Sequence, residues 1–192
     1  SSDREFETSL RLKDETDPWR RSVELAQRAR MTIDVSAADL EFAEASLGAF
    51  HETTWYFRRA HSEARQAWDR LRAELGTVKL EAALKEPPVT VLTLGPIGQG
   101  GRGRAEPPIV LVPISGQTYQ VERVPGTPLA PVQWRIRRLN PPLEDGPYYA
   151  CRLEDGSMQC DCADWTYQLG SSRSGVPSVC KHLSALMTMV WI

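Results

Sequence analysis

Apolar residues recur at every third or fourth position through the first 86 residues of the chain, which is the spacing of one helix face. Asp17 followed by Pro18 is typical of a helix start, because aspartate caps the first turn and proline suits the first helical position. The pattern predicts a short amphipathic helix from Trp19 to Arg30. Ser36, with Asp39 three residues further on, predicts a second helix start.

A longer helical pattern runs from Ala37 to about Leu84, and it predicts either one long helix or a helix pair divided near Gly76. Its apolar positions are Phe42, Ala45, Ala49, Thr53, Tyr56, Ala60, Ala64, Ala67, Leu71, Leu75 and Val78. Trp55, Phe57 and Trp68 widen the apolar surface beyond one seam, so we expect several faces of this region to contact protein. Either the region folds back onto the rest of the chain, or it docks a partner or a second copy.

The pattern changes at Pro87, because all but one of the 14 prolines and all but two of the 13 glycines lie beyond residue 86. Proline and glycine disfavour helix interiors, so strands and turns are expected there. The predicted strands are rich in Val, Ile and Thr: Val89 to Leu94, Ile109 to Ile114, Thr118 to Val124 and Val132 to Leu139. In the last strand we expect Trp134 and Ile136 to face the core and Arg135 and Arg137 to face the opposite side, with Arg138 beside them.

The cysteines gather in the C-terminal quarter of the chain. Cys160 and Cys162 form a C-x-C pair, and Cys180 and His182 form a C-x-H pair after seventeen intervening residues. Zinc prefers four sulfur or nitrogen ligands in a tetrahedron, with two sulfurs about 3.8 Å apart. Alternate residues of a flat strand stand roughly 6.5 Å apart, so the chain must curl at Asp161 to bring both thiolates to one ion. The spacing predicts a structural Zn²⁺ site made of these four residues.

Two alternatives to this ligand set stay open. The four cysteines could form disulfides in three connectivities or remain free thiols, although either arrangement leaves His182 without a role. Cys151 could also replace His182 as the fourth ligand and give an all-thiolate site. Asp161 and Asp164 are candidate hydrogen-bond acceptors for the imidazole or for the backbone.

The C-terminal pattern resembles the SWIM zinc finger family. The resemblance rests on the C-x-C and C-x-H pairs and on three neighbouring segments. These are a hairpin made of Tyr148 to Arg152, an Asp155-Gly156 turn and Ser157 to Cys160; the strand exit Cys160 to Trp165; and the closing helix Cys180 to Leu186. It implies a ββα zinc finger that contacts DNA or protein, and it covers only about residues 148–192.

These patterns together predict an α+β protein in three parts. Residues 1–86 are expected to be helical, residues 87–146 to be β-rich with Gly/Pro turns, and residues 147–192 to form the zinc finger. No apolar run approaches the length of a membrane span, so we expect no membrane association and a cytoplasmic location, or a nuclear one in a eukaryote.

No pattern in the sequence points to catalysis, and we expect a non-enzymatic protein without catalytic residues. Four protein ligands would fill a zinc coordination shell and leave no position for a reacting water. The segment Gly98 to Gly103 formally fits a dinucleotide-binding motif, but Pro107 and Pro108 follow it instead of a helix. His51 and His61 have no ligand partners at helical spacing and are expected to be ordinary helix residues.

The function predicted from these features is a zinc-stabilised adaptor that binds nucleic acid, a protein partner, or both. The net charge of −2 excludes a uniformly basic nucleic-acid binder, so any nucleic-acid contact must come from a local patch. The candidate phosphate contacts are Arg135, Arg137, Arg138, Arg173 and Lys181, and the SWIM resemblance favours DNA over RNA. The alternative is a protein-assembly subunit that uses the long helix, with a purely structural zinc finger.

Overall fold

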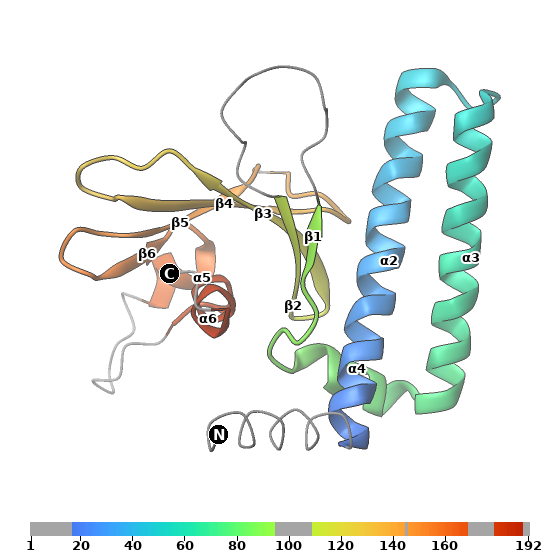
Figure 1. Cartoon of the computed structure of the whole chain (residues 1–192), viewed down its shortest axis with the longest axis horizontal. Coiled ribbons are helices and arrows are strands. Elements are labelled where there is room, and N and C mark those ends of the chain that lie inside the picture. Colours follow the sequence, from blue (N-terminus) through green and yellow to red (C-terminus); the bar gives the residue numbers. More distant parts are fainter. Residues whose placement is uncertain (1–16, 95–108, 145, 169–178, 190–192) are drawn as a thin grey trace, which may run out of the picture.

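The computed structural model describes residues 17–94, 109–144, 146–168 and 179–189. Three helices come first, an antiparallel sheet follows, and two short helices end the described chain (Figure 1). The helices are α2 (Pro18–Leu47), α3 (Glu52–Leu75), α4 (Thr77–Lys85), α5 (Ala163–Gln168) and α6 (Lys181–Thr188). The strands are β1 (Leu92–Leu94), β2 (Ile109–Ile114), β3 (Gln117–Val124), β4 (Val132–Arg138), β5 (Tyr148–Arg152) and β6 (Met158–Cys160). The mixed α+β class is therefore confirmed.

Helix α2 begins where the sequence predicted and continues further than expected. The Asp17 side chain accepts a hydrogen bond from the Trp19 N–H at 2.9 Å, and Pro18 occupies the first turn. The predicted helix start at Ser36 is wrong, because α2 runs through this residue without a break. The Ser36 hydroxyl donates to the carbonyl of Ile33 at 2.9 Å and lies 3.0 Å from Nδ1 of His61 on α3. The Ser36 hydroxyl thus bonds back to the preceding turn of α2, as serines within a helix do, instead of capping a new helix.

The break between the first two helices lies at the turn between α2 and α3. Gly48 has a φ of 87°, a left-handed conformation that glycine adopts without strain, and the Thr54 hydroxyl donates to its carbonyl at 2.8 Å. His51 caps α3 by accepting a hydrogen bond from the Thr53 N–H at 3.2 Å. The expectation that His51 is an ordinary helix residue is therefore wrong. Gly76 ends α3 as predicted.

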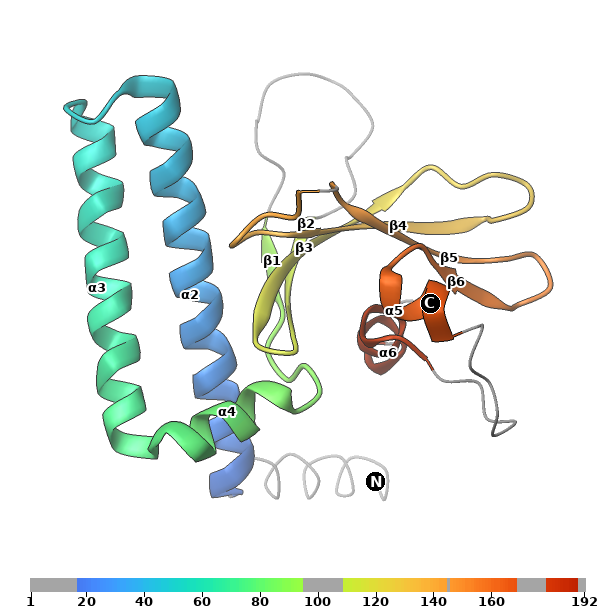
Figure 2. The same cartoon turned by 180° about the vertical axis from the view of Figure 1, so that it is seen from behind.

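The helices α2 and α3 form an antiparallel hairpin, so this region folds back on itself (Figures 1 and 2). The buried and half-buried positions of α3 are Thr54, Phe57, Ala60, His61, Ala64, Trp68, Leu71 and Leu75. Seven positions of the expected apolar set, from α2 to α4, are exposed instead: Phe42, Ala45, Ala49, Thr53, Tyr56, Ala67 and Val78. The inward stripe is therefore rotated from the expected one, because Trp68 packs against the cluster formed by Val23 of α2 and Leu80 of α4.

The six strands form one sheet in chain order, each antiparallel to the next. Strands β2 and β5 have the predicted bounds, and the other predicted strands are present with small shifts. Residues of β4 pair with residues of β5, for example Trp134 with Ala150, so the sheet continues without interruption from the middle of the chain into its C-terminal part. No helix in the described part of the chain is both long and apolar enough to cross a membrane.

The two faces of the sheet meet different helices. Tyr119, Ile136 and Ala150 on one face are buried against Leu183 and Leu186 of α6, and Trp134 packs against the same core, as predicted. Helix α2 contacts β2 and β3 on the other side of the molecule, and α4 also reaches β2 (Figure 2). The sheet therefore holds α6 and the helical hairpin apart.

Buried Gln27 fixes the end of the helical region against the chain that leads into β1. Its amide donates to the carbonyls of Glu86 and Pro87 at 3.2 and 3.1 Å, and its Oε1 accepts from the Val89 N–H at 2.9 Å. All the polar atoms of this buried amide are thus satisfied by backbone groups.

Candidate metal centre

Four buried side chains from β6 and α6 converge on the sheet face covered by α6. Cys160 is the last residue of β6, Cys162 precedes α5, Cys180 is the residue before α6 and His182 lies in its first turn. The four ligand atoms lie within 4.8 Å of one another, and each side chain is buried. The structure therefore brings together all four residues of the predicted ligand set, and they could hold a metal ion.

The chain curls at Asp161, as the geometry of a shared ion requires. The Asp161 N–H donates to the carbonyl of Tyr149 at 3.1 Å, while its Oδ1 accepts from the Tyr149 N–H at 2.7 Å. Helix α5 then begins, because the Thr166 N–H donates to the carbonyl of Cys162 at 3.0 Å. The Asp161 carboxylate thus fixes the turn between the two thiols.

Cys180 presents its thiol at the N-terminal end of α6. It occupies the N-cap position, and its carbonyl accepts the first helical hydrogen bond from the Ser184 N–H at 2.9 Å. A hydrogen bond with the Cys160 thiol lowers the pKa of Cys180 to about 4, and His182 and the Leu183 N–H act in the same direction. The same hydrogen bond and burial raise the pKa of Cys160. The cluster thus favours at least one thiolate, which is the form that binds metals.

The imidazole of His182 is held between two tyrosine rings. Its centroid lies 5.2 Å from that of Tyr119 in an edge arrangement and 4.7 Å from that of Tyr148. Its Nδ1 lies 3.9 Å from the Sγ of Cys160, whereas its buried Nε2 has no hydrogen-bond partner among the residues that the structure describes. Neither Asp161 nor Asp164 therefore accepts a hydrogen bond from this Nε2 in the described structure, whereas Asp161 does accept one from the backbone, as predicted.

The donor set fits zinc in type and in spacing. Three thiol sulfurs and one imidazole nitrogen are a ligand combination common in structural zinc sites, and no carboxylate is part of the cluster. In tetrahedral zinc a sulfur and a nitrogen ligand lie about 3.6 Å apart. The separation of 3.9 Å between Cys160 Sγ and His182 Nδ1 is close to this value.

Cys151 lies on the opposite face of the sheet from the cluster. It pairs with Gln159, whereas its neighbour Ala150 pairs with Cys160. Because side chains alternate along a strand, the Cys151 thiol points away from the Cys160 thiol. Burial raises the pKa of Cys151, and all four cysteines are free rather than disulfide-bonded. The geometry thus places His182, and not Cys151, beside the other three ligands.

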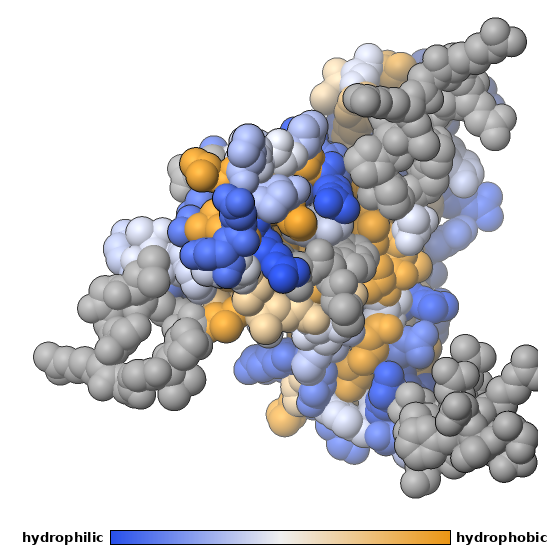
Figure 3. All heavy atoms as spheres, turned by 60° about the vertical axis from the view of Figure 1, so that its left-hand side comes forward, coloured by the Kyte–Doolittle hydropathy of each residue, from blue (hydrophilic) through white to orange (hydrophobic). Residues whose placement is uncertain are grey.

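The predicted phosphate contacts are dispersed, and those on β4 already bind groups of this chain. Arg135 forms an ion pair with Glu122, Arg137 donates to Oε1 of Gln120 at 2.8 Å, and Arg138 donates to the carbonyl of Pro141 at 2.7 Å. Lys181 is exposed at the start of α6. Arg173 lies outside the described residues, as does the glycine-rich segment 98–103. On the face drawn in Figure 3, hydrophilic and apolar side chains are interspersed.

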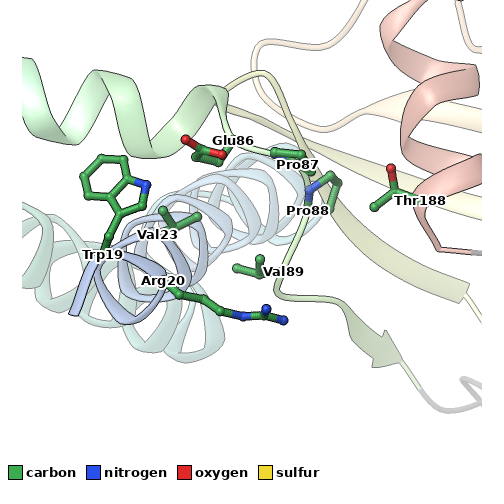
Figure 4. Close-up of a pocket in the computed structure, with 8 residues that line it drawn as sticks. All are labelled: Trp19, Arg20, Val23, Glu86, Pro87, Pro88, Val89 and Thr188. Atoms are coloured by element: carbon green, nitrogen blue, oxygen red, sulfur yellow. The ribbon is translucent and has the colours of Figure 1, made fainter. Parts of the chain in front are cut away.

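A hollow of about 440 Å³ separates the start of α2 from α6. Its walls come from Trp19, Arg20 and Val23, from the segment 86–89, and from Thr188 (Figure 4). Sequence reasoning missed it because its walls are distant in sequence. These lining residues include no cysteine or histidine, and the hollow is separate from the four clustered side chains.

Comparison with known proteins adds nothing to this geometry, since no family model, curated protein or solved structure matches the chain.

Proposed function

We propose that this chain is a zinc-stabilised, non-enzymatic adaptor of the SWIM type, with Cys160, Cys162, Cys180 and His182 as ligands of Zn²⁺. The observation that carries the proposal is the convergence of four buried donors within 4.8 Å. Three buried thiols and a buried imidazole carry a desolvation cost that a bound cation offsets.

Zinc has a structural role in this proposal, because its ligands would join the end of β6 to the start of α6. In this proposal β5, β6 and α6 would form the ββα unit, with α5 inserted between β6 and α6. Leu183 and Leu186 of α6 pack on the sheet. Helix α6 has only 8 residues, and a helix this short is marginal in isolation and depends on tertiary contacts. Coordination from both β6 and α6 would add the strongest of these contacts.

The ligand number supports a role outside catalysis. A catalytic zinc usually has three protein ligands and an open position for water or substrate. Four protein donors surround the centre of this cluster, so a tetrahedral ion bound there would have no such position.

Protein assembly is the adaptor role that the geometry supports best. The hairpin of α2 and α3 extends along one side of the molecule, away from the metal centre (Figure 1). By contrast, Arg135 and Arg137 have intramolecular partners and the net charge is −2. Nucleic-acid binding through the exposed side chains of Arg135, Arg137 and Lys181 is the second candidate, with DNA as the expected target.

Metal analysis of the purified full chain tests the zinc proposal. We expect one zinc per chain, and we expect a chelator that removes it to increase hydrogen exchange in residues 148–189 while the α2–α3 hairpin remains protected. Protein that folds without any bound metal, or whose exchange is the same with and without metal, would contradict a structural zinc site.

A further inference from the structure

Five large apolar side chains are exposed around the turn between α2 and α3, and we call them the hairpin-end surface. Their exposed fractions are 72% for Phe42, 47% for Leu47, 93% for Phe50, 61% for Trp55 and 67% for Tyr56. The turn lies at the end of the hairpin that is farthest from α4 (Figure 1). No described element of the chain covers these side chains.

The exposed area is large for a protein of this size. An aromatic side chain has roughly 150–250 Å² of surface, so the four aromatic residues expose on the order of 600 Å² together. The largest apolar patch of an ordinary monomer is about 300–600 Å², and each partner in a standard protein interface contributes about 800 Å². The hairpin-end surface could therefore supply most of one side of an interface.

The surface is also organised for recognition. The Tyr56 and Phe57 rings meet edge to face at 5.5 Å, and the Thr54 hydroxyl fixes the turn through the Gly48 carbonyl. Rigid aromatic side chains lose little conformational entropy when they bind, and they dominate the energetics of interfaces.

Unpaired carboxylates accompany the apolar residues. Asp39, Glu41 and Glu52 form no ion pair with any residue that the structure describes. The arginines at the same end are already engaged, because Arg58 pairs with Glu44 at 2.8 Å and Arg59 pairs with Glu63 at 3.0 Å. The electrostatic character around the hairpin-end surface is therefore acidic.

We propose that the hairpin-end surface docks a basic amphipathic segment of a partner protein, one that presents apolar side chains together with lysine or arginine. The apolar side chains would cover Phe50, Trp55 and Tyr56, and the cations would pair with Glu41 and Glu52. A second copy of this chain is a poorer occupant, since it would bring the same carboxylates against each other. The proposal rests on the adaptor function and specifies its partner chemistry.

Two matched synthetic helical peptides test the charge requirement. Both carry the same leucine face, and their polar face is lysine in one and glutamate in the other. We expect the zinc-loaded full chain to bind the lysine peptide at least tenfold more tightly than the glutamate peptide, with an affinity that falls as salt is added. Equal affinities for the two peptides would overturn the proposal.

Surface variants test the location. We expect Phe50→Ser and Trp55→Ser each to weaken binding of the lysine peptide about tenfold, and Glu41→Gln with Glu52→Gln to reduce its salt dependence. Leu129→Ser is the matched control, because Leu129 is 76% exposed but lies in the β3–β4 connection. A similar loss in Leu129→Ser, or unchanged binding in both serine variants, would overturn the proposal.

Sedimentation and metal analysis separate the remaining outcomes. If the chain sediments as a dimer that Phe50→Ser dissociates, a second copy is the occupant and the proposal is wrong. All variants should retain one zinc and the helical circular dichroism of the parent. If the parent binds zinc but not the lysine peptide, the docking proposal fails and the zinc site stands. If the parent binds no zinc, the proposed function itself is contradicted.

Discussion

The carboxylate of Asp34 on α2 accepts a hydrogen bond from the backbone N–H of Thr118 on β3 at 3.1 Å, across 84 positions of sequence. The side chain is 1% exposed and pairs with Arg30 at 3.3 Å. Arg30 in turn lies 5.9 Å from the centre of the Trp68 ring. One buried acid thus connects the helical hairpin to the sheet.

The first prediction concerns the pH dependence of this link. Burial raises the pKa of Asp34 above its ordinary value, and Arg30 only partly opposes the change. The folded state therefore holds the proton more tightly than the unfolded state, so stabilisation is greatest below about pH 4 and is lost as the pH rises through the folded-state pKa. We expect the stability of the parent relative to Asp34→Asn to decline with rising pH in chemical denaturation.

Asp155→Asn is the control for this measurement. Hydrogen bonds from Ser157 lower the pKa of Asp155. The stability of the parent relative to Asp155→Asn should therefore increase as the pH rises, opposite to the change expected for Asp34→Asn. A difference between parent and Asp34→Asn that stays constant with pH would contradict the assigned role of Asp34.

The second prediction concerns the ligands. Cys162→Ser and His182→Ala should each lower the metal content and increase hydrogen exchange in residues 148–189, whereas the helical signal should remain largely intact. Zinc contributes roughly 10–16 kcal/mol in small zinc fingers, and the effect should be smaller here because the sheet supports the site. Cys151→Ser should retain the metal, since this thiol faces away from the cluster. Full metal content in His182→Ala would assign the fourth position to another group.

The third prediction concerns close packing in the β3–β4 connection. A Cβ atom on Gly126 would lie 2.8 Å from the carbonyl oxygen of Ala130 and would overlap the carbonyl group of Pro131. These are backbone atoms, and two hydrogen bonds between Thr127 and Ala130 fix their position. Gly126→Ala should therefore destabilise the protein by about 1–3 kcal/mol in denaturant titration. Leu129→Ala in the same connection should change stability by less than about 0.5 kcal/mol; equal effects would contradict this account.

The fourth prediction concerns nucleic acid. Because Arg135 and Arg137 are already bound to Glu122 and Gln120, we expect no measurable affinity of the zinc-loaded protein for a short DNA duplex near physiological salt. Fluorescence anisotropy over a range of salt concentrations checks this. An affinity that falls steeply with salt and is lost in Arg135→Gln and Arg137→Gln would instead support the nucleic-acid role.

Local chemistry explains which elements the sequence could predict. The β-branched run of β2 and the run of β5 that begins with two tyrosines are both bounded by turn residues, and their limits needed no long-range information. The cluster of three cysteines and one histidine was predictable because the donor chemistry and spacing of a metal site are restrictive. Ser36 gave a wrong helix start, because a serine can lie within a helix as well as cap one. Here Ser36 lies within α2, beside His61 of α3.

Other features depended on contacts that no local pattern encodes. Trp55 and Trp68 both belong to the apolar pattern of α3, yet Trp68 packs into the helical cluster while Trp55 is exposed. The inward stripe of α3 is fixed by how this helix packs against both α2 and α4. The link between Asp34 and Thr118 depends in the same way on how the hairpin docks on the sheet.

The chain-order arrangement of the six strands has a consequence for biosynthesis. As the polypeptide leaves the ribosome, each strand can find its neighbour as soon as the next one emerges, without waiting for a distant segment. The thiols at Cys160 and Cys162 follow the other strands, and Cys180 with His182 comes later still. Capture of the proposed zinc ion is then a late event on a largely assembled scaffold. Zinc-starved cells should accumulate a species in which residues 148–189 are loosened while the α2–α3 hairpin is folded.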